Sequence, residues 1–389
     1  MRAELGLRDI EGVLAFIQRG VASTKRERAI HRFCEIAERL GEQAPLLRGL
    51  IRLSSLHWVQ GEATLGLEVA KRCLELRDLA RDPEMLADIY CMAAASSESC
   101  GKLREAAAYY ESAAQAAHEA ARMKRPLSPT WGLLHTIVIA TQTFTTLQLL
   151  GRVDQAAKTA ADALRQARLS QHLFSLSHAL LMAGIWPCLA KREAEKIPAY
   201  AEEVQALAEQ MGFAEWRPTF HRGWALAELG DLEIGVAEME VGVEGFKQRG
   251  GIARLPIHLA WLANGYARLG QTDRALSMLD QILADAERSG TVLDRAEILR
   301  IKGEVFLVHN RSAKTEAENC FRVAIDVART QEAKWWELCA TVSLARLLRD
   351  TGRRDEARAM LAEIYNWFTE GFDTADLKEA KALLDELKS

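Results

Sequence analysis

The chain has 389 residues, of which 49% are hydrophobic, and this length and apolar content exclude an intrinsically disordered protein. Its 50 basic and 54 acidic residues give a net charge of −4 and are mixed in short runs, so no basic face for nucleic-acid binding is indicated. Seven cysteines, none in a C-x-x-C pair, indicate reduced thiols in a cytoplasmic protein and suggest no metal site.

The N-terminal stretch MRAELGLRDIEGVLAFIQRG has acidic residues within its apolar part and lacks the unbroken apolar core of a signal peptide. The next segment, RERAIHRFCEIAERLG, predicts a lone second helix that ends at Gly41. The array that follows therefore begins with half a repeat, over residues 1–41.

A glycine with similar neighbours recurs at intervals of about 40 residues or about twice that. The occurrences are WVQGEATLG at Gly61, SCGKLREAA at Gly101, LLGRVDQAA at Gly151, ELGDLEIGV at Gly230, RLGQTDRAL at Gly270 and DTGRRDEAR at Gly352. Degenerate turns near Ala190 and Ser312 divide the two long gaps. A fixed period with a fixed turn predicts a stacked array of similar units.

Each unit is predicted to be a pair of helices. In LAWLANGYARLGQTDRALSMLDQIL, Leu262, Ala263 and Tyr266 share one face before the glycine, and Ala275 and Leu279 share one face after it. This spacing of small and large residues resembles the tetratricopeptide repeat. It predicts an all-α protein, a right-handed α-solenoid of about eight such pairs in one domain over residues 1–389, with helix pairs at 42–373.

Residues 126–151 and 169–190 contain no Asp, Glu, Lys or Arg, yet they are too rich in Thr, Ser, Gln and His for membrane spans. Each contains the first helix of a unit, and first helices of such arrays line the concave side. We interpret them as the wall of an apolar, hydroxyl-rich ligand or peptide groove; alternatively, superhelical closure or the 123–132 loop covers them. The groove residues predicted from the repeat offsets are Val138, Thr141, Thr145, Gln148, Ser177 and Leu180.

Nearby aromatic and basic residues extend this candidate groove. Trp131 lies in the long loop of its unit, and Trp186 precedes Pro187, which should kink its helix because proline has no amide hydrogen to donate. Arg217 and His221 open the next first helix and could pair with an anionic group of a ligand. For each of these residues a purely structural role is the alternative.

Two other positions bear on peptide binding. Asn264 occupies the position at which peptide-clamping repeats carry an asparagine, but the accompanying lysine position is Ala260, which argues against a clamp for chaperone tails. Trp335 and Trp336 begin a later first helix; one is expected in the core and the other at the preceding groove.

The C-terminal sequence predicts a helix from about Thr374, because Leu377, Ala380, Leu384 and Leu387 recur three and four residues apart. A solenoid leaves the apolar face of its last unit without a following repeat. We therefore expect residues 374–389 to be a capping helix.

The motif WFTEGFDTADL at residues 367–377, with FHRGWALAELGDLEIGVAEM at 220–239, resembles the C-terminal region of a family of bacterial multidomain proteins. Its members place a class III nucleotide cyclase or winged-helix domain first, a P-loop signalling ATPase of the STAND type next, and helical repeats last. The resemblance covers nearly the whole chain and implies a sensor or partner-docking region for such an ATPase.

The chain carries no catalytic signature of that family. No G-x-x-x-x-G-K-[ST] loop, G-x-G-x-x-G, H-E-x-x-H or G-x-S-x-G occurs. We therefore expect a non-enzymatic interaction module without cofactors that binds a protein segment or small effector, and neither nucleic acid nor membrane. The alternative is a C-terminal fragment of a cyclase or ATPase-type transcriptional regulator with no independent activity.

Overall fold

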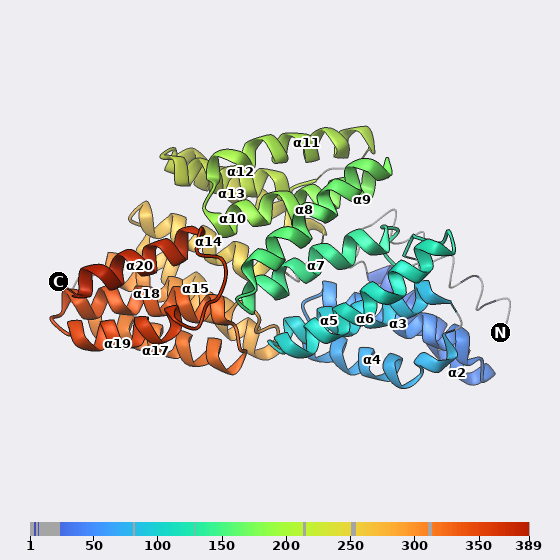
Figure 1. Ribbon diagram of the computed structural model, residues 1–389. Coiled ribbons are helices and arrows are strands. Elements are labelled where there is room, and N and C mark those ends of the chain that lie inside the picture. Colours follow the sequence, from blue (N-terminus) through green and yellow to red (C-terminus); the bar gives the residue numbers. More distant parts are fainter. Residues whose placement is uncertain are drawn as a thin grey trace.

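The computed structural model describes Glu4, Leu7 and residues 24–80, 82–128, 130–212, 215–249, 254–309 and 313–388. Within these ranges the chain forms helices and a single isolated bridge between Leu127 and Leu134 (Figure 1). The degenerate turn predicted near Ser312 and most of the N-terminal segment before Thr24 lie outside the described residues.

After α2 (Thr24–Leu40), the described residues form eight successive helix pairs, and a final helix follows them. The pairs are α3 (Gln43–Val59) with α4 (Ala63–Glu75), α5 (Pro83–Ser99) with α6 (Leu103–Arg122), α7 (His135–Leu149) with α8 (Val153–Ser170), α9–α10 (Leu173–Lys191) with α11 (Ile197–Gln210), α12 (Arg217–Leu229) with α13 (Leu232–Arg249), α14 (Leu255–Arg268) with α15 (Thr272–Ser289), α16 (Arg295–His309) with α17 (Lys314–Thr330), and α18 (Lys334–Asp350) with α19 (Arg354–Tyr365). The final helix is α20 (Ala375–Lys388). The predicted all-α solenoid of tetratricopeptide-like pairs is confirmed.

The turns within the pairs follow the sequence pattern. Gly61, Gly101 and Gly151 have φ values of 70°, 73° and 80°, in the left-handed region that a side chain disfavours. At the degenerate turn near Ala190 the same region is occupied by Arg192, with a φ of 57°. The repeat period therefore persists where its glycine has been lost.

The fourth unit is the irregular one. Between α9 (Leu173–Ala179) and α10 (Trp186–Lys191) the helix widens into a π-helical segment, η2 (Leu180–Ile185), directly before Trp186-Pro187. A wider helical turn is one way to accommodate a proline that cannot donate to the α-helical ladder. Short 3₁₀ turns, η1 (Arg77–Leu79) and η3 (Ala194–Lys196), complete the elements.

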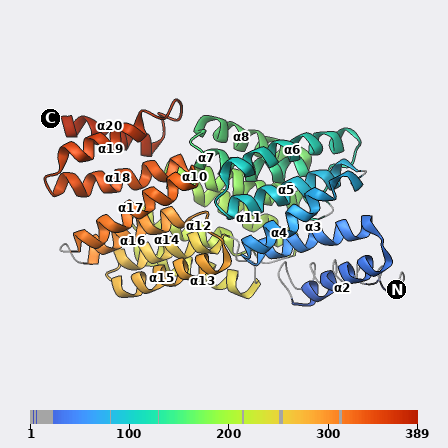
Figure 2. The same ribbon diagram turned by 90° about the horizontal axis from the view of Figure 1, so that it is seen from below.

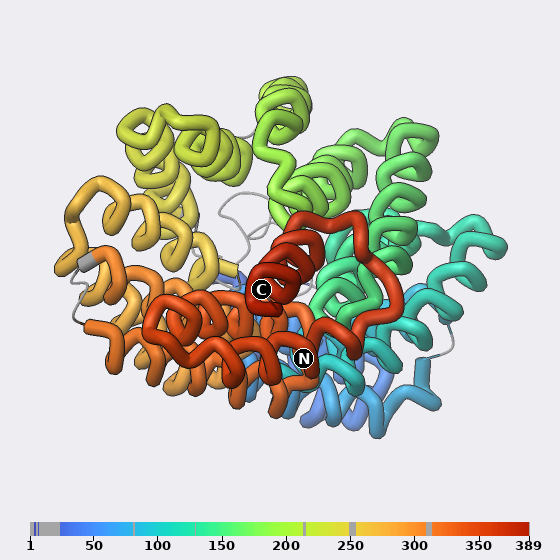
Figure 3. Tube along the Cα trace, turned by 60° about the vertical axis from the view of Figure 1, so that its left-hand side comes forward, coloured from blue at the N-terminus to red at the C-terminus, as the bar shows by residue number. Residues whose placement is uncertain are grey.

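The chain winds round in Figure 3, far enough for its later units to lie beside its earlier ones (Figures 1 and 2). The amides of Val292 and Leu293, in the α15–α16 loop, donate to the carbonyl of Ser99 at the end of α5, over 2.9 and 3.2 Å. Thr291 likewise donates from its hydroxyl to the carbonyl of Gly61. We call these contacts, and the apolar cluster beneath them, the closure contact.

The closure contact has its own hydrophobic core. Leu103 of α6 and Leu149 and Leu150 at the end of α7 pack with Leu293 and with alanines of α16 and α17. Farther along, Val153 at the start of α8 belongs to the apolar core of α17 to α20. Burying apolar side chains from both halves of the chain stabilises the curvature of the superhelix.

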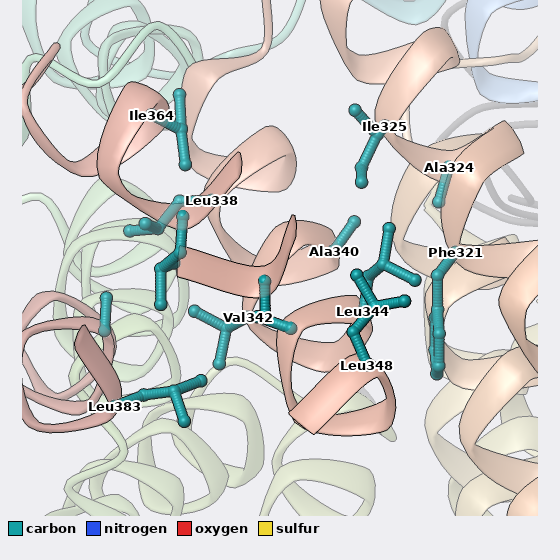
Figure 4. Close-up of a cluster of buried hydrophobic side chains, with 14 of the residues drawn as sticks. Phe321, Ala324, Ile325, Leu338, Ala340, Val342, Leu344, Leu348, Ile364 and Leu383 are labelled. Carbon is teal, nitrogen blue, oxygen red and sulfur yellow. The ribbon is translucent and has the colours of Figure 1, made fainter. Parts of the chain in front are cut away.

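The C-terminal units share the largest core cluster. Residues of α18 such as Val342 and Leu344 lie between Phe321 of α17 on one side and Ile364 of α19 and Leu383 of α20 on the other (Figure 4). In α20, the residues Leu377, Leu384 and Leu387 are also buried in this cluster, whereas its charged residues Lys381 and Asp385 are exposed.

The charge-free stretches are mostly buried between other helices. Helix α7 contacts α5, α6, α8, α9 and α18, and the α9–α10 helix contacts α7, α8 and α11. Among the described residues, Leu173–Lys191 is the one helix that is long and apolar enough to cross a membrane, and more than half of it is buried in the protein. A core helix has the same properties.

The loop before α7 is fixed to α5 by one buried carboxylate. Asp88 accepts hydrogen bonds from Ser128 over 2.7 Å and from His135 over 2.9 Å, and the hydroxyl of Thr130 donates to its other oxygen. Because the serine and the histidine both contact the carboxylate and not each other, the cluster is a structural clasp rather than a nucleophilic triad. It holds Trp131 against Trp58, with ring centroids 5.8 Å apart.

Helices α12 and α13 cross so closely that their glycines touch the opposing backbone. A Cβ atom on Gly235 would lie 2.5 Å from the carbonyl oxygen of Gly223 and 2.6 Å from the amide of Ala227. We expect Gly235→Ala to lower the free energy of unfolding by about 2 kcal/mol, as overpacking does. Gly66→Ala in α4 is the control, since its Cβ would meet Ser96 at 3.2 Å. Equal urea midpoints for the two variants would contradict this account of the crossing.

Glu98 lies buried below the closure contact, where the hydroxyl of Thr146 donates to its carboxylate over 2.6 Å. Burial raises the pKa of Glu98 to about 7, although Arg254 and the Thr146 bond oppose the shift. A carboxyl whose pKa is raised on folding contributes stability below its unfolded pKa, and this contribution is lost as the pH rises through about 7.

Glu98→Gln keeps the acceptor for Thr146 and cannot ionise. Relative to this variant, the unmodified protein should lose about 3 kcal/mol of unfolding free energy between pH 5 and pH 8. Urea denaturation of both proteins at several pH values gives the two unfolding free energies. Their difference removes the contribution of other titrating groups, such as Asp294, that both proteins share. If the unfolding free energies of the two proteins ran parallel with pH, a raised pKa of Glu98 would be ruled out.

Candidate functional site: the central cavity

The superhelix surrounds a partly open cavity of about 360 Å³, lined by residues of α7, α10, α12, α13, α14, α16, α18 and α20. Apart from α13 and α20 these are the first helices of their pairs, so the cavity lies on the concave side of the solenoid. Its volume falls in the range that holds small molecules and peptide side chains.

One wall of the cavity is aromatic. The rings of Trp186 and Trp261 lie 5.7 Å apart between centroids, and Trp224 lies 6.4 Å from Trp261. Trp335 and Trp336 at the start of α18 also line the cavity. Large aromatic side chains supply contact area to a ligand at low conformational cost.

Ion pairs within the protein occupy most of the charged groups of the cavity. Arg300 binds Glu297 through two hydrogen bonds of 2.6 and 2.7 Å, and it also pairs with Glu304. Arg268 likewise pairs with Glu228. Such mutual pairing leaves these groups little capacity for a ligand.

Helix α20 closes the cavity on the C-terminal side through the same kind of pairing. Arg192 at the end of α10 contacts Asp376 and Glu379 of α20, and Arg346 of α18 also contacts Glu379. These four residues line the cavity. The C-terminal helix therefore contributes carboxylates to the cavity wall as well as leucines to the core.

Arg254 and Asp294 are the exception among the charged groups described around the cavity, because neither side chain makes a hydrogen bond. Their closest charged atoms are 4.0 Å apart, which is too long for one. The Asp294 side chain is 7% exposed, and burial raises its pKa while Arg254 opposes the shift. The guanidinium of Arg254 lies over the ring of Trp186, 4.6 Å from its centroid.

Two side-chain amides complete the polar lining. Gln148 of α7 and Asn264 of α14 both face the cavity, and no hydrogen bond to another described residue engages either amide. Each amide can donate and accept at once. A backbone peptide group offers the complementary acceptor and donor.

Of the ten groove residues predicted from the sequence, three line this cavity: Thr145, Gln148 and Trp186. They come from the last turn of α7 and the first residue of α10. The structure places the other seven outside the cavity wall.

Four of those seven are buried between helices. Val138 packs in the core with α5 and α6, and Leu180 packs against α11. Thr141 is fully buried, donating to the carbonyl of Val138 and bonding His178, while Ser177 is 3% exposed. The N-terminal half of α7 is covered by α9, so the repeat offsets that aimed these residues at a groove aimed them at a neighbouring helix.

The remaining three are also engaged within the protein. Trp131 packs on Trp58, as described above. Arg217 forms two hydrogen bonds of 2.8 and 2.6 Å with Glu215, which neutralises it. His221 is 1% exposed, donates through Nδ1 to the carbonyl of Arg217, and has its pKa lowered to about 4 by burial. A neutral, buried imidazole is not an anion receptor.

The sequence does contain a signal for the actual wall that the groove prediction missed. The pattern Arg-x-x-x-His-x-x-Trp occurs twice, as Arg217–Trp224 and as Arg254–Trp261, at equivalent places in consecutive units. In both units the histidine Nδ1 bonds the carbonyl of the arginine, over 2.8 and 2.6 Å, and the tryptophan reaches the cavity. No group of three or more His, Cys, Asp or Glu that could hold a metal occurs among the described residues.

No protein-family model and no sequence of a curated protein matches the chain. Among solved structures, a Rap protein complexed with competence and sporulation factor is similar over 99% of both chains, with a TM-score of 0.62 and 12% identity. NprR in complex with its cognate peptide NprX is similar over 75% of this chain and 82% of its own, with a TM-score of 0.49 and 12% identity. A STAND protein with a tetratricopeptide repeat sensor, from Pyrococcus horikoshii, is similar over 95% and 55%, with a TM-score of 0.41 and 13% identity.

At such low identity the likeness to the Rap protein shows the fold alone, and the two lower scores add nothing to it. The chain has the fold of tetratricopeptide-like helical solenoids.

Proposed function

We propose that the chain is a non-catalytic interaction module, a sensor that binds a short protein segment or small effector in the central cavity. The observation that carries this proposal is a cavity on the concave side whose wall combines five tryptophans with unengaged side-chain amides. Apolar rings with a few convergent polar groups are typical of ligand sites. The Rap neighbour, which has the same fold, is complexed with competence and sporulation factor.

The polar groups favour a peptide segment over a purely apolar ligand. Gln148 and Asn264 lie on different helices, α7 and α14, so two amides can hold two points of an extended backbone. Main-chain hydrogen bonds of this kind provide affinity, and adjacent pockets provide selectivity for side chains. Here the tryptophan rings would form those pockets.

The proposed regulatory role is a change of superhelical curvature on binding. A ligand held between α7 and α14 would contact both sides of the closure contact, and small rotations between repeats add up along a solenoid. The WFTEGFDTADL motif resembles the C-terminal region of the multidomain family described above. This resemblance suggests that the partner that responds to the change of curvature is a signalling ATPase or nucleotide cyclase, either attached to the repeats or separate from them.

Substitution of one amide tests this proposal. We expect Asn264→Ala to weaken binding of peptides selected from a random hexapeptide pool by about tenfold, because one or two backbone hydrogen bonds are lost. Quenching of the cavity tryptophans by each selected peptide gives its dissociation constant. Asn366→Ala, at an exposed position after α19, is the matched control and should leave the constant unchanged.

Selection of no peptide at all, or equal weakening by both substitutions, would refute peptide binding in the cavity. Circular dichroism melting of each variant separates loss of binding from loss of folding.

A further inference from the structure

Arg254 Nε and Asp294 Oδ1 are buried and have no hydrogen-bond partner among the residues that the structure describes. We propose that this pair binds a neutral amide group of the ligand, with the guanidinium donating to the amide oxygen and the carboxylate accepting the amide hydrogen. The inference rests on the proposed function and names the chemical group read at this point of the cavity.

The two opposite charges select against charged ligand groups. Arg254 and Asp294 are 4.0 Å apart, so a ligand charge near one is close to the other. Attraction of a ligand charge by one partner is therefore offset by repulsion from the other. An amide has both an acceptor and a donor and satisfies both partners without carrying charge.

The preceding repeat unit provides an internal comparison. Arg217 occupies the position equivalent to Arg254, and it is held by Glu215 through two hydrogen bonds. Arg254 instead faces a carboxylate that is close enough to neutralise it and too far away to bond it. Buried polar groups without hydrogen bonds cost free energy, so this arrangement indicates a partner that comes from outside the chain.

The geometry of the pair is also held in place. The Arg254 guanidinium lies over the Trp186 ring, 4.6 Å from its centroid, and the Arg254 carbonyl accepts a hydrogen bond of 2.6 Å from His258. Asp294 directly precedes α16, and its backbone carbonyl accepts the first hydrogen bond of that helix, from the amide of Ile298. A pre-positioned donor and acceptor lose little entropy when a ligand binds.

Three pools of hexapeptides, all N-acetylated and C-methylamidated, test the proposal. The neutral pool has no ionisable residue and is divided into peptides with and without Asn or Gln; the acidic pool has one Asp or Glu, and the basic pool has one Lys. The unmodified protein should retain the neutral pool about tenfold better than either charged pool. Equal retention of both neutral halves identifies a backbone amide, and retention of the Asn or Gln half alone identifies a side-chain carboxamide.

Substitutions should then change the preference in opposite directions. Asp294→Asn removes the carboxylate nearest to Arg254 and should favour the acidic pool, whereas Arg254→Gln leaves the carboxylate and should favour the basic pool. The double variant R254Q/D294N keeps a donor and an acceptor without charge, so it should restore the neutral preference. The control R217Q/E215Q changes the pair that is already bonded and should leave the preference unaltered.

Mass spectrometry of the retained peptides gives the preference, and thermal melting confirms that each variant is folded. A protein that prefers a charged pool, or single variants that retain the neutral preference, would overturn the amide site alone. Retention of no pool would overturn the proposed function and the amide site together.

Discussion

The closure contact is the constraint on which the rest of the structure depends. In an open solenoid each repeat touches its neighbours only, and the first helices line a trough. Here the loop that carries Val292 and Leu293 bonds the end of α5, and leucines of α6 and α7 pack against it. The concave face therefore becomes the wall of a cavity. A residue of α7 such as Gln148 can share that wall with residues of α14 and α18.

Closure also explains the charges inside the cavity. Where the two sides of the superhelix approach each other, arginines and carboxylates of the first helices lose part of their hydration. Ion pairs between them offset this cost. Arg300 pairs within α16, whereas Arg192 reaches α20, which lies 184 residues later in the sequence. The C-terminal helix thus does more than cover the last apolar face, because its carboxylates also pair with Arg192 and Arg346 in the cavity wall. Arg254 and Asp294 are the pair that lie close together without a hydrogen bond between them.

Features that depend on local sequence could be predicted, and features that depend on closure could not. The turn glycines and the spacing of Ala and Leu encode helix pairs, and Leu377, Leu384 and Leu387 encode a helix with one face to bury, because each signal acts within a few turns. The charge-free sequence of α7 encodes burial, but it does not say what covers the helix. Helices α5, α9 and α18 pack on α7 and cover most of it. Of its predicted groove residues, only Thr145 and Gln148 therefore reach the cavity.

The paired Arg-x-x-x-His-x-x-Trp patterns show why the site itself is harder to predict than the fold. The two units place arginine, histidine and tryptophan alike, with the same bond from histidine to the arginine carbonyl. They differ in the acid that each arginine meets: Glu215 is two residues away in the sequence, whereas Asp294 comes from the start of α16, in the next unit. A bonded pair and an unbonded pair therefore arise from nearly the same local sequence. The position of the following repeat, and not the local sequence, distinguishes the arginine that is bonded to its acid from the one that is not.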